Sequence, residues 1–308
     1  MTFGNRFLVS LCCALALAGT VASASEYIVV DNQTGHVLAA SDKDAKVQVG
    51  SLTKVAAALV VLDWLSVTKT DAGTMVTVPS EAIEAGGINR VGLQPGDEIS
   101  IRDLLYASLM ASDNTAASVL AQYVGGHLPN RSGLPPEGNF VSQMNALAKT
   151  LEMKRTRFLN PHGLDNIEGG LPFSTAADMA RLTRYAYLKP SFTFYVSQKS
   201  RDIHVMRGGV DNTISLANTN ELLDQEGIDG VKTGKTERAG ECVILSSDRS
   251  PEVARNGPQV SVTPRRIIVV LLGSSNRFPE GLGLIRSGWN LYDAWAAAGR
   301  KMSERTAL

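Results

Sequence analysis

An apolar run of eleven residues, from Val55 to Leu65, constrains the fold of this chain more than any other feature. Asp63 is the single charged residue in the run, so a helix over it would be apolar on nearly every side. Such a helix is buried in the middle of a domain. The chain has 308 residues and a hydrophobic content of 44%, enough for a large core. The sequence therefore predicts a central helix enclosed by one domain.

Ser51 and Lys54 stand three positions apart at the head of this run, on the same side of the predicted helix. Serine is a preferred helix cap, and the positive end of a helix also favours negative charge on an oxygen atom. Burial lowers the pKa of a lysine, so its amine can accept a proton near neutral pH. We interpret Ser51 as both the cap and a nucleophile, with Lys54 as its base. This stretch alone also fits a capping serine beside a lysine that reaches solvent.

Two short motifs downstream fit the same chemistry. In the sequence SDN, Ser112 can relay a proton and Asn114 can bind a substrate amide. In the sequence KTG, at 232–234 on a predicted strand, an ammonium and a hydroxyl group suit a carboxylate, and the glycine leaves the strand edge open to a substrate backbone. Each motif taken singly is also ordinary turn or strand-end sequence.

The chain repeats two of these patterns without their context. SVTK occurs at 66–69, but polar, turn-forming residues follow it, so we expect no helix to place Lys69 beside Ser66. SSN occurs at 274–276, after the KTG motif instead of before it. The ordered set of three motifs, each on the expected kind of element, therefore carries far more weight than any one of them.

The first 24 residues predict a secretory signal peptide: a basic residue, an apolar stretch and the small residues Ala22-Ser23-Ala24. Its removal leaves 29 basic and 30 acidic residues, a formal charge of −1, which gives no reason to expect nucleic-acid binding. Cys242 is then the only cysteine, so we expect no intramolecular disulfide and no multi-cysteine metal site, and no cofactor. No later apolar run approaches the roughly 20 residues that span a bilayer, so we expect no firm membrane anchor.

The order of predicted elements is strands, then helices, then strands and a last helix. This order fits an α+β fold in which the two ends of the chain share one antiparallel sheet flanked by helices. We expect a mostly helical subdomain at roughly 70–205. Proline-bearing and polar stretches predict loops at 127–140 and 248–264. As a hypothesis, the second loop lies beside the strand of Lys232 and controls access to it.

The three motifs, with FLNPHGLDN (158–166), STAADMARLTRYA (174–186) and the stretch 218–243, resemble the low-molecular-mass penicillin-binding proteins. These are the serine D-alanyl-D-alanine carboxypeptidases and endopeptidases of the S11 peptidase type, within the penicillin-binding and β-lactamase superfamily. The resemblance runs from about residue 26 to about 300. It implies a β-lactamase/transpeptidase-like fold with a five-stranded antiparallel sheet, in a single catalytic domain over 25–308 without a C-terminal β-rich domain.

The resemblance also implies roles for the motif residues. A nucleophile would be acylated, its base and a second serine would move the proton, and the other residues would hold the substrate. The backbone N–H groups of the nucleophile and of the residue after KTG would form an oxyanion hole. His162 would support the site without taking part in catalysis. The expected catalytic residues are Ser51, Lys54 and Ser112, and the expected substrate-binding residues are Asn114, Lys232, Thr233, Gly234 and Lys235.

The implied function is cleavage of the D-Ala-D-Ala or D-Ala-diaminopimelate bonds of peptidoglycan stem peptides through an acyl-enzyme on Ser51. The expected location is the periplasm or cell envelope, and β-lactam antibiotics are the expected covalent inhibitors. The motifs do not separate a carboxypeptidase from an endopeptidase. Asp113 makes the second motif SDN, as in class A β-lactamases, but their Glu-x-x-x-Asn pattern is missing between Ser112 and Lys232, so at most weak β-lactamase activity is expected. A non-catalytic binder or scaffold for cell-wall peptides is the alternative of another class.

Overall fold

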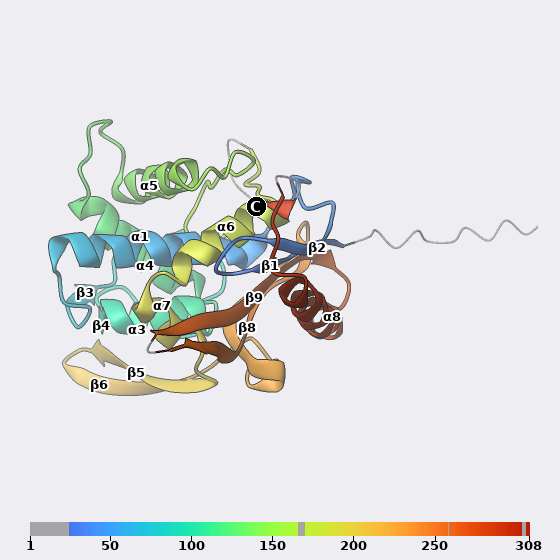
Figure 1. Cartoon of the computed structure of the whole chain (residues 1–308). Coiled ribbons are helices and arrows are strands. Elements are labelled where there is room, and N and C mark those ends of the chain that lie inside the picture. Colours follow the sequence, from blue (N-terminus) through green and yellow to red (C-terminus); the bar gives the residue numbers. More distant parts are fainter. Residues whose placement is uncertain (1–24, 166–169, 258, 304–305) are drawn as a thin grey trace, which may run out of the picture.

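The computed structural model describes residues 25–165, 170–257, 259–303 and 306–308, and the two ends of this described chain meet in one antiparallel sheet (Figure 1). The strand order is β2-β1-β9-β8-β7, which confirms the predicted five-stranded sheet. The expected signal peptide lies outside the described residues. The strands are β1 (Glu26–Asp31), β2 (Val37–Ser41), β7 (Ile228–Thr236), β8 (Gly240–Asn256) and β9 (Gln259–Ser274).

Alternating side chains of the sheet contribute to two cores. In β9, Ile267 packs under helix α8 (Arg277–Ala297), while the next residue, Ile268, joins the core on the other face, with helix α6 (Ala176–Ala186). This is the two-residue period of a strand buried on both faces. Cys242 is a buried core residue of β8, and burial raises the pKa of its thiol to about 11.

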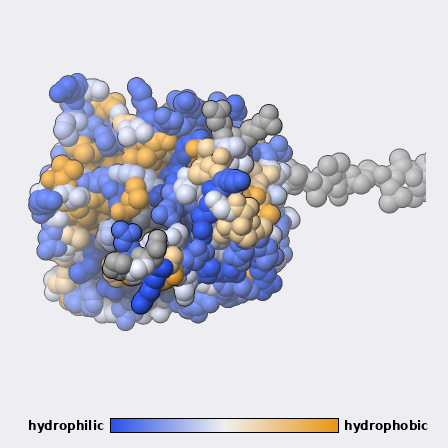
Figure 2. Space-filling model, viewed as in Figure 1, coloured by the Kyte–Doolittle hydropathy of each residue, from blue (hydrophilic) through white to orange (hydrophobic). Residues whose placement is uncertain are grey.

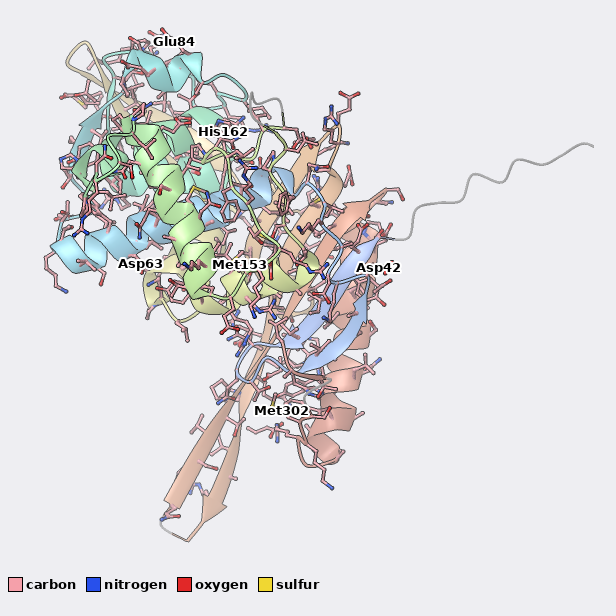
Figure 3. All side chains as sticks on the ribbon, turned by 90° about the horizontal axis from the view of Figure 1, so that it is seen from above. Asp42, Asp63, Glu84, Met153, His162 and Met302 are labelled. Carbon is pink, nitrogen blue, oxygen red and sulfur yellow. The ribbon has the colours of Figure 1, made fainter. Side chains whose placement is uncertain are left out.

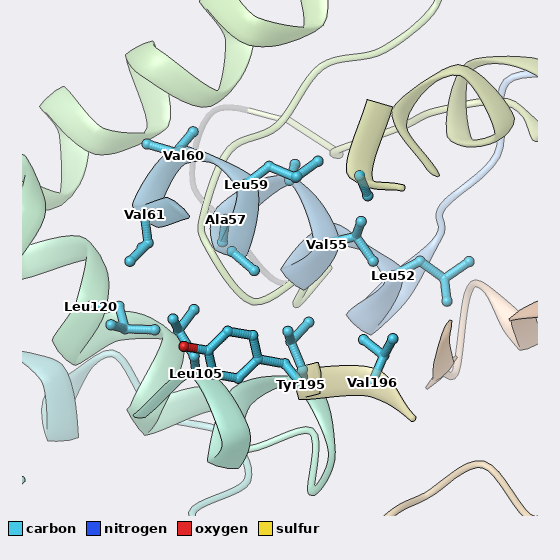
Figure 4. Packing of buried hydrophobic residues seen from close by; sticks show 14 of the residues in the cluster. Leu52, Val55, Ala57, Leu59, Val60, Val61, Leu105, Leu120, Tyr195 and Val196 are labelled. Carbon is cyan, nitrogen blue, oxygen red and sulfur yellow. The ribbon is translucent and has the colours of Figure 1, made fainter. Parts of the chain in front are cut away.

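The apolar run forms the predicted central helix, α1 (Thr53–Thr68), behind a 3₁₀ turn, η1 (Gly50–Leu52). From Thr53 to Leu62 its side chains are buried on all sides within the core (Figure 4), whereas its last turn is exposed. In the described part of the chain, the segment Gly50–Thr68 is the one helix long and apolar enough to cross a membrane, but 72% of the window is buried inside the fold. It is thus the core helix of a globular domain. The helix ends in a left-handed residue, Lys69, so the SVTK repeat falls on its last turn.

The rest of the molecule is mainly helical, and hydrophilic residues cover most of the face in Figure 2, with apolar patches over the helical part. A second sheet of order β3-β4-β5-β6 borders it. This sheet contains a hairpin of β5 (Ser200–Arg207) and β6 (Val210–Ala217), two strands that were not predicted from the sequence. The remaining elements are β3 (Met75–Thr77), β4 (Glu98–Ser100), η2 (Gln225–Gly227), α2 (Ser80–Glu84), α3 (Ile101–Leu109), α4 (Asn114–His127), α5 (Pro136–Thr150) and α7 (Pro190–Val196).

Two predicted loops are wrong in part. Helix α5 begins at Pro136, inside the loop expected at 127–140, because proline is well suited to the first turn of a helix. The stretch expected as a loop at 248–264 continues β8 and β9 as a two-stranded ribbon, paired from Glu252↔Thr263 to the tip (Figure 3). Its alternating valines suit a strand, and an irregularity between Arg249 and Glu252 accommodates Pro251.

The ribbon does not border the strand of Lys232 in the way expected. Ile228, the first residue of β7, pairs with Ser247, so the ribbon extends beyond that end of β7. The KTG motif and the following Lys235 lie toward the other end of the same strand. This placement does not support the hypothesis that the segment controls access to Lys232, which stays a prediction for a deletion to test.

Candidate active site

Lys54 is the centre of a buried polar cluster at the head of α1. Its side chain has no exposed surface, and its Nζ lies 2.9 Å from Ser51 Oγ, 2.6 Å from Asn114 Oδ1 and 3.0 Å from the carbonyl oxygen of His162. These partners come from η1, α4 and the loop at 160–165. Asn114 and His162, which lie 60 and 108 positions after Lys54 in the sequence, thus both contact its amine.

Burial lowers the pKa of Lys54 to about 7, although the carboxylate of Asp113 acts in the opposite direction. A neutral amine has two N–H groups and one lone pair. The Asn114 and His162 oxygens can only accept, so they take the two N–H groups and leave the lone pair for the hydroxyl of Ser51. The arrangement therefore orients Lys54 as a proton acceptor for Ser51.

Ser51 sits in the 3₁₀ turn, and its side chain makes no capping hydrogen bond. The expectation that Ser51 also caps the helix is wrong, because the turn itself supplies a backbone acceptor, Gly50 O, for the N–H of Thr53. Its hydroxyl is instead directed at Lys54.

Two glycines let other segments approach this turn closely. A Cβ on Gly234 of β7 would lie 2.9 Å from the carbonyl oxygen of Val49 and 3.2 Å from the backbone nitrogen of Ser51. Gly163 has φ of +88°, and a Cβ there would lie 1.9 Å from the carbonyl oxygen of Gly50. Because these glycines have no side chain, the edge of β7 and the 160–165 loop can both approach the turn closely. These two contacts fix the position of Ser51.

The SDN motif joins α3 to α4. Ser112 is buried and has φ of +61°, a strained conformation for a residue with a side chain. Asp113 caps α4: its two carboxylate oxygens accept from the backbone N–H groups of Ala116 (2.8 Å) and Val91 (3.0 Å). Asp113 therefore anchors the loop at 86–92 to the start of α4 and aims Asn114 at Lys54.

The KTG motif lies on β7, the edge strand of the sheet beside η1. Lys232 is buried, and its Nζ donates to the carbonyl oxygen of Thr233 at 2.8 Å. The Thr233 hydroxyl donates to Thr219 Oγ1 at 2.6 Å, and the Thr219 backbone N–H donates to the carbonyl oxygen of Met110. Thr219 thus links the KTG strand to the segment that leads into SDN. Lys235 has an exposed side chain that pairs with Glu241.

The site has an excess of positive charge. Burial lowers the pKa of Lys232 well below its usual value, and the charges of Lys54, Arg277 and Arg90 act in the same direction. Arg277 also donates to the carbonyl oxygen of Gly234 at 3.0 Å. An anionic group that entered the site would relieve this repulsion and restore the charge of Lys232.

His162 is buried, and burial together with the charge of Lys54 lowers its pKa to about 3, so the imidazole is neutral. Its contact with Lys54 is made by the backbone carbonyl. The loop is held by Asn160, whose side chain accepts from the N–H groups of His162 and Gly163 and donates to the carbonyl of Leu164. These contacts give His162 a supporting position.

The structure brings Ser51, Lys54 and Asn114 into direct contact and packs Gly234 against the same turn. Thr219, Arg90 and Arg277 were absent from the sequence interpretation. Single polar residues outside a motif give no signal in one sequence, because their importance comes only from what the fold brings near them.

Comparison with known proteins agrees with this geometry. The family model for D-alanyl-D-alanine carboxypeptidases, peptidase S11, matches residues 16–254. The chain is 30% identical to the D-alanyl-D-alanine carboxypeptidase DacF of Bacillus subtilis, over 73% of this chain and 54% of that protein. It is 31% identical to DacC of Escherichia coli, over 88% and 62%. A D-alanyl-D-alanine endopeptidase of Pseudomonas aeruginosa is 34% identical, over 77% and 71%.

The match to DacF and DacC thus spans less than two thirds of the length of those relatives. Among solved structures, the DD-transpeptidase of Streptomyces K15 superposes with a TM-score of 0.72 at 25% identity, covering 86% of this chain and 96% of that one. The carboxypeptidase DacD of Francisella tularensis gives a TM-score of 0.70 at 24% identity, covering 91% and 73%. The penicillin-binding fold expected from the sequence is thereby confirmed.

Proposed function

Because the chain belongs to the D-alanyl-D-alanine carboxypeptidase family, we propose that it is a serine D,D-peptidase that cleaves peptidoglycan stem peptides after a D-alanine. The observation that carries this proposal is the buried Lys54 amine, whose N–H groups are taken by two oxygen acceptors and whose lone pair is left for Ser51. A protein that only binds peptides has no use for such a base.

In the first half of the reaction, Ser51 Oγ attacks the carbonyl carbon of the D-alanine, and Lys54 takes the hydroxyl proton. The tetrahedral oxyanion binds the backbone N–H groups of Ser51 and Lys235. Collapse breaks the peptide bond and leaves the acyl group on the serine. Ser112 passes the proton to the departing amine, which balances the step without a cofactor.

In the second half, water attacks the ester carbonyl and Lys54 takes a proton from it. The ester bond breaks, the proton returns to Ser51 Oγ, and the acid product leaves. The substrate is held by Asn114 at its acyl-side amide and by Lys232 and Thr233 at the carboxylate next to the leaving amine. The positive charge gathered around Lys232 supports this placement, since it favours an anionic group. Gly234 keeps the strand edge open to the substrate backbone.

We further propose that residues 1–24 are a signal peptide, that the chain works in the periplasm or cell envelope, and that 25–308 is one catalytic domain. β-Lactam antibiotics would acylate Ser51 because they present a reactive amide beside a carboxylate. Carboxypeptidase and endopeptidase substrates both carry a carboxylate near the leaving amine, so the same residues serve either.

The test uses the purified chain without its first 24 residues, with the Ser51→Ala variant as control. Cross-linked muropeptide dimers and monomeric pentapeptides are incubated separately, and the products are identified by mass spectrometry. Ser51-dependent conversion of dimers to monomers identifies an endopeptidase, and loss of one alanine from pentapeptides identifies a carboxypeptidase. The absence of any Ser51-dependent product would contradict the proposal and favour a binder.

A further inference from the structure

The segment 218–220, between β6 and β7, is fixed to three other parts of the fold. The side chain of Asn218 donates to two backbone carbonyl oxygens at and just after the end of α7. The side chain of Asn220 is buried and donates to the carbonyl oxygen of Gly230 in β7 at 3.1 Å. Between them, the backbone N–H of Thr219 donates to the carbonyl oxygen of Met110 at 3.0 Å. Thr219 is thus held between the KTG strand and the segment that leads into SDN.

The hydroxyl of Thr233, the middle residue of KTG, contacts the hydroxyl of Thr219. It donates to Thr219 Oγ1 at 2.6 Å, and Thr219 is its one hydrogen-bond partner in the part of the chain that the structure describes. A threonine hydroxyl has one proton to donate and two lone pairs that accept. In the free site, the proton of Thr233 therefore points at Thr219.

The proposed reaction needs this proton in another direction. Thr233 is to donate it to the substrate carboxylate next to the leaving amine, so its O–H group must turn when the substrate binds. The oxygen of Thr233 can then accept from the hydroxyl of Thr219, because a hydroxyl donates and accepts at once. Hydrogen bonds in such a chain strengthen one another. The change consists of the rotation of two O–H groups, and no proton leaves its oxygen.

The same residue relates the donor to the carboxylate to the serine that relays the proton. Met110, which holds the backbone of Thr219, stands two residues before Ser112. In the proposed reaction Ser112 reaches the leaving amine and Thr233 reaches the carboxylate, and one carbon atom separates these two substrate groups. Thr219 therefore connects two segments that act on neighbouring atoms, where small displacements are costly.

We propose that Thr219 is a positioning residue for substrate binding. Its hydroxyl orients the Thr233 hydroxyl in the free site, and it donates to the Thr233 oxygen once Thr233 donates to the substrate carboxylate. Thr219 itself does not touch the substrate. This inference rests on the proposed peptidase function and adds to it a residue outside the three motifs.

The first experiment removes the hydroxyl in Thr219→Val, which keeps the shape of the side chain, and retains it in Thr219→Ser. Values of kcat and KM are measured on the muropeptide that the wild-type chain cleaves, since dimers and pentapeptides both carry the carboxylate. The contact with the carboxylate exists before and during the attack of Ser51, so its loss changes KM. We expect KM to rise about tenfold in Thr219→Val, with kcat within about twofold, and to rise far less in Thr219→Ser.

The matched control is Thr150→Val. The hydroxyl of Thr150 is exposed and donates to the carbonyl oxygen of Ala146 within α5, so its removal should leave KM unchanged. Comparison of Thr219→Ala with Thr219→Ser repeats the test in a smaller side chain, so the result does not depend on one variant. Thermal unfolding of each variant shows that it is folded.

A double-mutant cycle shows whether Thr219 acts through Thr233. Thr233→Val removes the donor to the carboxylate, so a further Thr219→Val should lower kcat/KM by less than about twofold. Losses that multiply would mean that Thr219 supports the fold independently of Thr233.

This inference would be overturned by an unchanged KM in Thr219→Val, by equal losses in Thr219→Val and Thr219→Ser, or by multiplying losses in the cycle. Ser51-dependent hydrolysis by the wild-type chain would uphold the proposed function in each of these cases. The absence of Ser51-dependent hydrolysis in the wild-type chain would overturn the proposed function and this inference with it.

Discussion

Lys54 Nζ lies 2.9 Å from Ser51 Oγ, and the contact is direct, without an imidazole between them. The nearby histidine, His162, is neutral, and the hydrogen bond that it accepts from Lys54 is made by its backbone carbonyl. Activation of the serine therefore depends on one buried amine, and the charge state of that amine controls the site.

The rate of Ser51 acylation should follow the neutral fraction of Lys54. Burial lowers the pKa of this amine to about 7, so the proton-accepting form dominates above that pH and falls about tenfold per pH unit below it. Stopped-flow acylation by benzylpenicillin between pH 5 and 9 should rise to a plateau, with an apparent pKa near 7. A rate that is flat down to pH 5 would show that Lys54 is not the base.

The lowered pKa of Lys54 should also make the free energy of unfolding depend on pH. Between about pH 7 and 10.5 the unfolded chain holds a proton on Lys54 that the folded chain has lost, so the free energy of unfolding rises with pH across this window. Lys54→Met removes the effect. Urea unfolding of both proteins from pH 6 to 10 should show the wild type gaining on the variant as pH rises. Parallel curves would mean that the lysine is charged in the folded state.

Gly163→Ala should destabilise the protein severely. The new methyl group would lie 1.9 Å from the carbonyl oxygen of Gly50 at a φ of +88°, so both sterics and backbone strain oppose it. We expect a loss of about 3 kcal/mol or more, or failure to fold. Gly126→Ala in α4, where a Cβ meets no atom within 4 Å, should instead be neutral or stabilising by up to about 1 kcal/mol. Thermal unfolding compares the two variants. Equal Tm values would contradict the close approach of Gly163 to the carbonyl oxygen of Gly50.

The ribbon at the far end of β8 and β9 should be dispensable for catalysis. Its paired residues extend beyond Ser247, away from the KTG end of β7. Replacing 250–262 with a two-residue Asn-Gly turn should leave kcat/KM on short peptides within about twofold of the wild type, since Asn-Gly suits a tight hairpin. A tenfold loss with unchanged Tm would restore the idea that this segment controls access.

The sequence predicted the central helix, an antiparallel sheet shared by the two ends of the chain, and the elements that hold the three motifs, while the five strands of that sheet came from the family resemblance. The predictions made from the residues succeed because they depend on local patterns and on the order of elements and short motifs. The ribbon was missed because its stability comes from cross-strand pairs, and polar residues such as Ser250 and Arg255 looked like loop sequence. Likewise, the prediction that Ser51 caps the helix was wrong because a 3₁₀ turn precedes the helix, and no sequence pattern predicted that turn.

For the active site, the motif residues could be predicted from the sequence, but the residues outside the motifs that contact them could not. The contact between Lys54 and the His162 carbonyl joins segments 108 residues apart, and a backbone oxygen carries no sequence signal. The link from Thr233 through Thr219 to Met110 is of the same kind. Such contacts are created by the packing of the two sheets and the helices between them, so they become visible only in the fold.

The most direct test of Ser51 as the nucleophile is the intact mass of the purified chain after incubation with benzylpenicillin at pH 8, followed by peptide mapping. One adduct per chain, on the peptide that contains Ser51 and absent from Ser51→Ala, is the expected result. An unmodified chain, or an adduct that persists in Ser51→Ala, would contradict it.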